Sequence, residues 1–156
     1  MRFIPSAALV LAFAAAAACS DTLTANDTAA PGPTLNWGPA PAIFPAGAQM
    51  AVMQGDPSGN ALFTIRLKLP DGYKIPPHTH PTDENVTVVS GAFRVGMGTT
   101  FDLATASKLD AGGFVVAPAN GAHFAAAQGE TIVQVHAMGP FAMTYVNPAD
   151  APSAGK

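Results

Sequence analysis

The most regular pattern in this chain is an alternation of apolar and polar residues between positions 61 and 69. Phe63, Ile65, Leu67 and Leu69 are apolar, and the residues between them are Thr64, Arg66 and Lys68. A period of two predicts a β-strand with one face buried and the other in water. The sequence therefore predicts an amphipathic strand here.

Seven further short apolar segments, separated by Gly, Pro, Asn and Asp, are also typical of strands. They comprise residues 48–54, 85–90, 92–98, 114–117, 122–127, 131–136 and 141–146. Short strands at regular spacing with turn residues between them predict an all-β jelly roll or barrel. The only helical signal is about one turn at residues 102–107. The apolar, Pro-rich residues 35–44 predict an irregular arm or edge strand.

The start of the chain has a different composition. Arg2 precedes an apolar run over residues 9–18, and small residues continue to Cys19. This pattern predicts an export signal, and the run is shorter than the roughly 20 apolar residues that a membrane-spanning helix needs. We therefore expect a signal peptide at 1–18, a flexible tether at 19–34, one β-barrel domain at 35–150 and a disordered tail at 151–156.

Cys19 is the only cysteine, so no disulfide is expected. Its position resembles the acylated cysteine of a bacterial lipoprotein, although Ala16 stands where the lipobox usually has Leu. The resemblance implies an outer-membrane lipoprotein that meets the membrane only through a lipid on Cys19. Secretion into the periplasm after cleavage at an Ala-rich site is the alternative.

The net charge of this 156-residue chain is -3, and only 11% of its residues are charged. No basic patch is available to bind nucleic acid, so that class of partner is not expected. A chain of this length forms one domain with a substantial core.

The candidate chemistry lies in two motifs. The first is Gly72-x5-His78-x-His80-x3-Glu84-x6-Gly91, and it resembles the first motif of the cupins at every position. In the second, Gly112, Pro118 and His123 have the spacing of the second cupin motif. Asn120 replaces its inner Gly, and Ala127 its final Asn. Asn accepts the positive φ of such a turn, so the departure is mild.

Side chains two residues apart on a strand share a face, so His78 and His80 can bind one ion. The resemblance implies that Glu84 and His123 complete a site of three histidines and one glutamate for a divalent transition metal. Such donors suit Fe, Mn, Ni, Cu, Co or Zn rather than Ca or Mg. Four protein ligands would leave coordination positions open for a small molecule.

The residues around this site depend on the strand register. The parity of Glu84 puts Val86, Val88 and Ser90 on the inner face. A two-residue turn at 128–129 would pair His123 with Gln134, so that residues 132, 134 and 136 point inward. A three-residue loop would turn Val133 and Val135 inward instead. Under the first register we assign catalytic roles to Glu84, Gln134 and His136.

Two functions remain open. The resemblance implies a small metal-dependent enzyme of dioxygenase, isomerase or decarboxylase type, an oxidoreductase above all, acting on a small molecule. The alternative is a non-catalytic, envelope-tethered cupin that binds a metal or a small ligand. Residues 35–44 pack either on their own barrel or on a second subunit, as in a cupin homodimer.

Overall fold

Nine strands make up almost all of the regular structure of residues 34–152, which are the residues that this computed structural model describes. The expected signal peptide, all but the last residue of the tether, and residues 153–156 lie outside that range. The strands are β1 (Gly38–Pro39), β2 (Gln49–Gln54), β3 (Leu62–Leu69), β4 (Lys74–Thr79), β5 (Glu84–Met97), β6 (Ser107–Asp110), β7 (Phe114–Ala117), β8 (His123–Met138) and β9 (Thr144–Tyr145). The 3-10 helix η1 (Pro148–Asp150) is the only helix in this range, and it cannot cross a membrane.

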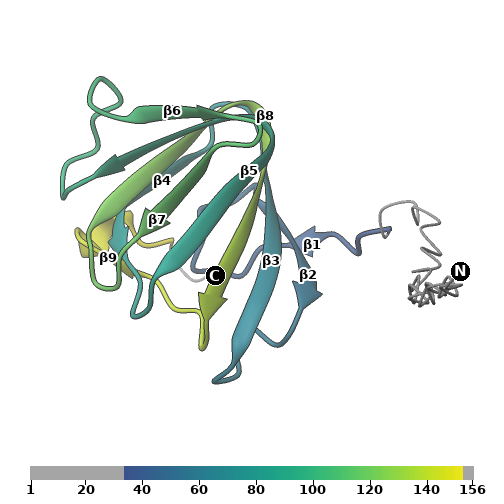
Figure 1. Ribbon diagram of the computed structural model, residues 1–156. Helices are drawn as coiled ribbons and strands as arrows, with labels where there is room; N and C mark the ends of the chain where they lie inside the picture. The colour runs from purple at the N-terminus through teal and green to yellow at the C-terminus, as the bar shows by residue number, and fades with distance from the viewer. Residues whose placement is uncertain (1–33, 153–156) are drawn as a thin grey trace, which may run out of the picture. The chain divides into compact units, whose positions relative to one another are not determined.

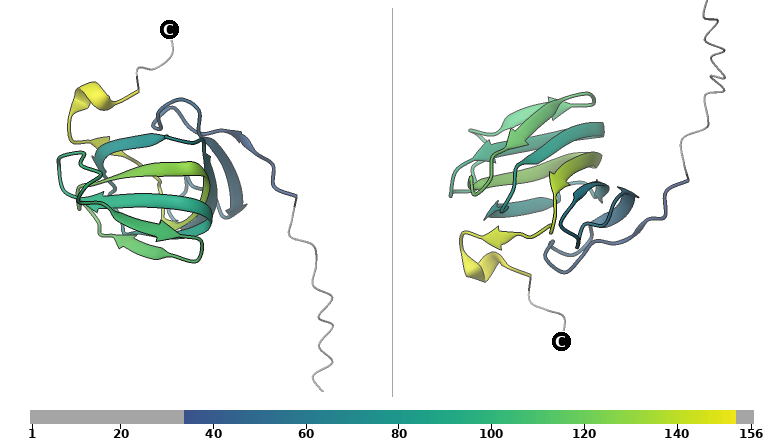
Figure 2. Two further views of the ribbon diagram at one scale, coloured as in Figure 1. Left: turned by 90° about the horizontal axis from the view of Figure 1, so that it is seen from above. Right: turned by 60° about the horizontal axis from the view of Figure 1, so that its bottom comes forward.

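The two longest strands, β5 and β8, pair with each other over most of their length and connect the other strands into one nine-stranded sheet. The start of β5 pairs with β7 and with the end of β8, and the latter continues to β3, β2 and β1. The end of β5 pairs with β6 and with the start of β8, which continues to β4 and β9. All pairs are antiparallel, and the strands curl around a common interior (Figures 1 and 2). This arrangement is the expected all-β jelly-roll barrel.

Two glycines mark the places where these long strands bend. Gly91 in β5 has φ 78° and Gly129 in β8 has φ 74°, a region that residues with a side chain rarely adopt. The pairing of β5 with β8 shifts register between Val88 and Ala92. A β-carbon on Gly91 would collide with the backbone of Glu130. The bends are therefore bulges inside continuous strands.

This continuity corrects two expectations. Residues 85–90 and 92–98 were predicted as separate strands, and so were residues 122–127 and 131–136. Each pair forms a single strand, and no hairpin turn lies at 128–129. Gly129 instead donates its N–H to Asp71 Oδ1 at 2.7 Å within β8.

The core is built from the inward faces of the strands. The buried face predicted for β3 is confirmed, since Phe63, Ile65, Leu67 and Leu69 are each at most 3% exposed, but Thr64 on the opposite face is also buried. The helical turn expected at 102–107 is a hydrogen-bonded turn, Thr105 N–H to Asp102 O, and the unpredicted strand β6 follows it. The segment 35–44 contributes the short edge strand β1 and then an irregular arm that buries Phe44 to 4% exposure.

Candidate metal centre

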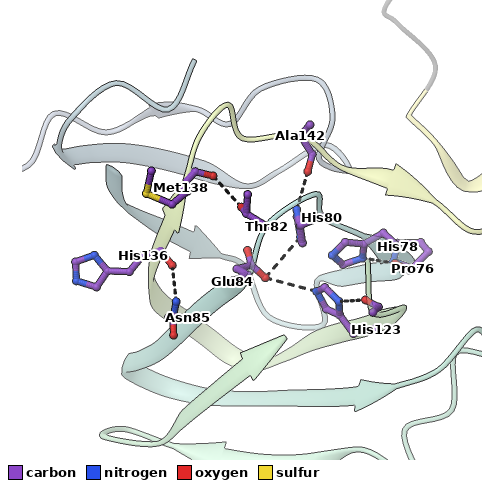
Figure 3. A network of polar contacts seen from close by, with 11 residues as sticks. Pro76, His78, His80, Thr82, Glu84, Asn85, His123, His136, Met138 and Ala142 are labelled. Atoms are coloured by element: carbon purple, nitrogen blue, oxygen red, sulfur yellow. Dashed lines mark hydrogen bonds and ion pairs between the residues drawn. The ribbon is translucent and has the colours of Figure 1, made fainter. Parts of the chain in front are cut away.

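Three histidines and one glutamate come together inside the barrel from three strands. His78 lies on β4 opposite its cross-strand partner His123 at the start of β8, and His80 follows the end of β4. Glu84 is the first residue of β5, and all four side chains are buried. Figure 3 shows the rings of His80 and His123 directed at the carboxylate of Glu84. The structure thus brings together all four residues that the sequence suggested as ligands.

The distances are close to those of a metal site. One ring nitrogen from each of the three histidines lies within 4.8 Å of the others. Glu84 Oε2 is 3.5 Å from the Nε2 atoms of both His80 and His123. Two nitrogens bound to one ion at about 2.1 Å lie at most about 4.2 Å apart. A small contraction would bring the three histidines onto one ion, with Glu84 beside two of them.

The backbone fixes the tautomer of each histidine. His78 Nδ1 donates to the carbonyl oxygen of Pro76 at 2.7 Å, His80 Nδ1 to that of Ala142 at 2.7 Å, and His123 Nδ1 to that of Gly121 at 3.1 Å. A carbonyl oxygen can only accept, so Nδ1 carries the hydrogen in each ring. Every Nε2 lone pair is therefore free to bind a metal, and the hydrogen bond from Nδ1 to the backbone holds the orientation of each ring.

Two of these nitrogens have no partner. His80 Nε2 and His123 Nε2 are buried without a hydrogen bond to any residue that the structure describes, and their 3.5 Å separations from Glu84 Oε2 are too long for a good one. A buried polar atom without a partner costs about 1–3 kcal/mol. A bound cation would satisfy both nitrogens and the carboxylate together. The residues present therefore fit a divalent transition metal.

The electrostatics of the site favour an ionised glutamate. Burial alone would raise the pKa of Glu84, but the adjacent His123 and the nearby His80 and His78 outweigh it and hold the pKa below its usual value. Burial likewise acts to lower the pKa of His123, but Glu84 and the Gly121 carbonyl outweigh it and raise that pKa. Burial, together with the proximity of His123, lowers the pKa of His78 to about 3. His78 is therefore neutral at neutral pH, as a metal ligand must be.

The second motif supports the first through the backbone. Asn120 adopts φ 60°, which confirms that Asn takes the positive φ at the position where the cupin motif has Gly. Its N–H donates to the carbonyl oxygen of His80 at 2.8 Å, and Gly121 N–H donates to Pro118 O at 2.8 Å. The turn that presents His123 thus also holds His80 in place.

The inner face around the site is apolar. Val86 and Val88 point inward as the parity of Glu84 predicts, and they are 4% and 1% exposed. Ser90 does not follow them, because the bulge at Gly91 turns it outward and leaves it exposed. On β8, Val133 and Val135 face the interior and are 2% and 1% exposed.

The structure does not bring Gln134 and His136 to the site, so the catalytic roles expected for them are not supported. Gln134 and His136 lie an odd number of positions from His123, so in one continuous strand they are on the opposite face from it. Val133 and Val135 lie an even number of positions away and share its face. Gln134 Oε1 accepts from Arg66 Nε at 3.0 Å, and exposed His136 contacts Thr64 Oγ1 through Nδ1 at 2.7 Å. In Figure 3 the His136 ring points away from the other three histidines.

Two aromatic residues of the C-terminal segment pack against the ligands; sequence reasoning named Tyr145 as a residue near the pocket but missed Phe141. The ring of Phe141 is stacked on His80, with centroids 5.1 Å apart and an interplanar angle of 16°. Tyr145 lies 6.1 Å from His78, ring to ring, and is its cross-strand partner. No spacing in the sequence links these positions to the motifs, because β9 and β4 are far apart in the chain and pair only in the folded barrel.

Comparison with known families places the chain. A sequence model described as "Domain of unknown function (DUF4437)" matches residues 16–144. The chain belongs to the DUF4437 family. No curated protein sequence matches it.

Solved structures show which fold this DUF4437 protein has. A candidate acetylacetone dioxygenase from Methylibium petroleiphilum PM1 superposes with a TM-score of 0.58 at 20% identity, covering 77% of this chain and 81% of that one. An RmlC-like cupin from Shewanella frigidimarina NCIMB 400 gives 0.52 at 15% identity, covering 77% and 92%. An oxalate oxidase gives 0.52 at 21% identity, covering 69% and 59%. The DUF4437 domain therefore has the cupin fold.

Proposed function

We propose that this protein binds one divalent transition metal ion through His78, His80, Glu84 and His123, and that it is a small metal-dependent oxidoreductase acting on a small molecule. The observation that carries the proposal is a pair of buried nitrogens, His80 Nε2 and His123 Nε2, which lie beside an ionised Glu84 and have no hydrogen-bond partner in residues 34–152. A protein tolerates such an arrangement at a functional site rather than in an ordinary core.

The ligand atoms restrict which metal ions can bind. Imidazole nitrogens with one carboxylate suit Fe, Mn, Ni, Cu or Zn, and they do not satisfy the all-oxygen preference of Ca or Mg. A bound ion of this kind would supply a Lewis acid with open positions and, if redox-active, electrons for dioxygen. The assignment as an oxidoreductase is supported by the names of two proteins with the same fold, a candidate dioxygenase and an oxalate oxidase.

A second candidate function is a non-catalytic cupin that binds a metal or a small ligand. The supporting observation is the inner face itself, where His78, Glu84 and His123 are surrounded by apolar side chains. With Gln134 and His136 on the outer face, Glu84 is the only carboxylate among the described residues that line this inner face.

Metal analysis of the full chain, expressed with its N-terminal segment, tests the proposal. We expect close to one equivalent of a first-row transition metal in the wild type and in His136→Ala, and loss of that metal in His123→Ala. His136→Ala is the matched control because it removes an exposed imidazole from the same strand. Equal retention by both variants, or no uptake of Fe(II), Mn(II), Ni(II), Cu(II) or Zn(II) by the wild type, would reject the site.

The identity of the metal separates the two functions. Stoichiometric iron, copper or manganese favours an oxidoreductase, and the iron-loaded protein should then consume dioxygen when its substrate is added. Stoichiometric zinc alone favours the binding module.

We also propose export, with residues 1–18 as the signal and Cys19 as the lipid attachment site, on the sequence pattern alone.

A further inference from the structure

The apolar chamber beside the metal site is walled almost entirely by strands. Fifteen residues line it, including the ligands His78, Glu84 and His123. All but Phe44 and Met143 lie on β3, β4, β5, β7 or β8. Strand residues are held by ladder hydrogen bonds, on one side in the edge strand β7 and on both sides in β3, β5 and β8, so they do not move aside singly. The two segments that carry Phe44 and Met143 have no such ladder and are therefore the parts of the wall most free to change the size of the chamber.

The chamber is nearly closed as it stands. The space open to the centre of a water molecule is about 20 Å³, and roughly 10–15 Å³ is enough for one water. Phe44 is 4% exposed, and its ring stacks on Phe141 with centroids 5.9 Å apart. Anything larger than about one water must therefore displace a wall residue, and Phe44 is the larger of the two that can move.

The arm that carries Phe44 is held by few bonds. Tyr145 Oη donates to the carbonyl oxygen of Ile43 at 2.8 Å, and Tyr73 Oη donates to that of Pro45. Within the arm, Phe44 N–H donates to Pro41 O at 2.9 Å. No β-ladder crosses residues 40–48, although Ala40 N–H donates to Ala48 O at 3.0 Å. Opening the arm breaks two hydroxyl contacts and an aromatic stack, whereas opening a strand would break a ladder.

The chamber wall also disfavours negatively charged ligands. No Lys or Arg is among the residues that line it. Arg66 is turned outward to Gln134, and Arg94 donates from its Nη1 to Leu103 O at 3.4 Å. An anionic group beyond the metal would have no cation to pair with, and burying it would be costly.

We propose that Phe44 is the specificity-determining residue of this chamber. It limits the ligand to a compact, uncharged molecule with one metal-binding head and a short apolar tail, and it admits that ligand by swinging out with the arm of residues 41–45. This inference rests on the proposed metal site and deepens it by naming the class of ligand.

A homologous series of aliphatic hydroxamates tests it, because these probes share one metal-binding head and differ in the apolar tail. The protein is loaded with Co(II), whose visible absorption reports ligand binding, and titrated with acetohydroxamate, butanohydroxamate, hexanohydroxamate and octanohydroxamate. In the wild type we expect affinity to fall beyond the shortest tails. In Phe44→Ala we expect it to rise about fourfold for each added methylene that the new space holds, equivalent to about 0.8 kcal/mol.

Two further variants control for poor folding and for effects unrelated to the chamber. Phe44→Leu keeps the core filled if Phe44→Ala folds poorly, and it should extend the tail limit by less. Phe114→Ala removes an aromatic ring that is 56% exposed on β7, and it should leave the wild-type profile unchanged. A hydroxamate whose tail ends in a carboxylate should bind no better to Phe44→Ala than to the wild type.

The movement of the arm is tested by the rate at which hydroxamates associate. Tyr145→Phe removes the hydroxyl that holds Ile43 and leaves the chamber wall intact, so hydroxamate association should be severalfold faster with the tail limit unchanged. The inference is overturned if Phe44→Ala and Phe44→Leu both keep the wild-type tail profile, or if Tyr145→Phe leaves the association rate unaltered. If the wild type retains no Co(II), the proposed metal site itself fails, and metal analysis separates that outcome from the others.

Discussion

His80 Nδ1 donates a hydrogen bond of 2.7 Å to the carbonyl oxygen of Ala142, a residue 62 positions further along the chain. The ring is thus fixed between the backbone of the C-terminal segment on one side and the carboxylate of Glu84 on the other. Its orientation depends on how residues 141–145 pack. Changes to that segment should therefore reach the metal site without touching a ligand.

Phe141→Ala should weaken metal binding and lower stability. The substitution removes the ring that stacks on His80 and that also meets Phe63 edge-on at 5.5 Å. Changes to groups that orient metal ligands typically cost about 10–100-fold in affinity. We expect an increase of about tenfold in the metal dissociation constant and a loss of about 2 kcal/mol in the free energy of unfolding, since Phe141 is half-buried. Isothermal titration calorimetry and urea denaturation measure the two effects. Phe114→Ala is the control, and equal affinities for the two variants would contradict this dependence.

The metal-free protein should lose stability most steeply below about pH 4.5. His78 has a pKa of about 3 in the folded chain and about 6.5 when unfolded, so from pH 6.5 downward the unfolded state binds the extra proton. Each unit of difference corresponds to about 1.4 kcal/mol. His123 acts oppositely: its raised pKa contributes stability at low pH that is lost as pH rises through the folded value. Below pH 6.5 His123 is protonated in both states, so between pH 6.5 and 4.5 the loss of stability comes from His78 alone.

Below the ordinary Glu pKa of 4.5, Glu84 adds to the loss, because its lowered pKa means that the unfolded chain takes up the proton first. Urea denaturation in EDTA over a range of pH values should show a moderate decline that begins near pH 6.5 and steepens below pH 4.5, and His78→Gln should remove the decline above pH 4.5. A decline that is steepest above pH 5 would show that other groups control acid stability.

Gly96→Ala should destabilise the barrel through packing rather than backbone strain. A β-carbon on Gly96 would overlap the ring of its cross-strand partner Phe124, which is 1% exposed. Overpacking of this kind costs about 1–3 kcal/mol. Gly38→Ala is the matched control, because nothing lies within 4 Å of its added β-carbon. Combining Gly96→Ala with Phe124→Leu should recover most of the lost free energy. If the double variant is no more stable than Gly96→Ala, the ring is not the cause.

The mature chain should begin at Cys19. Removal of residues 1–18 of the 156 leaves 138 residues, and a lipid on Cys19 would add to their mass. Intact-mass spectrometry of the protein from the membrane fraction of a bacterial host measures both. An unmodified N-terminus beyond Cys19 would leave secretion as the export route.

The sequence predicted the ligand cluster better than its surroundings. The spacing of His78, His80 and Glu84 lies within one local stretch, and the second motif supplied His123, so the four residues could be grouped without tertiary information. Strands β2, β3 and β7 were also predicted to within a residue, because each is a short alternating or apolar run between turn residues.

What the sequence could not supply was continuity across the bends. Gln128-Gly129 has the composition of a tight turn, but its residues lie inside β8, where Asp71 takes the Gly129 N–H. That contact comes from a residue 58 positions away, and local preference cannot anticipate it. The mistaken hairpin placed Gln134 and His136 on the wrong face. The packing of Phe44 and Phe141 was missed for the same reason, since both lie in irregular segments that only the closed barrel brings together.

The unbroken course of β8 from His123 to Met138 limits how this chain can change length. Side chains alternate along it in one phase, so His123, Val133 and Val135 share the inner face even across the bend. Inserting or deleting a single residue within either half would reverse every position beyond it, turning valines to water and His136 inward. Only the bulge at Gly129 could absorb such a change. We therefore expect natural length variation in DUF4437 proteins to collect in the loops between strands, with β8 itself constant in length.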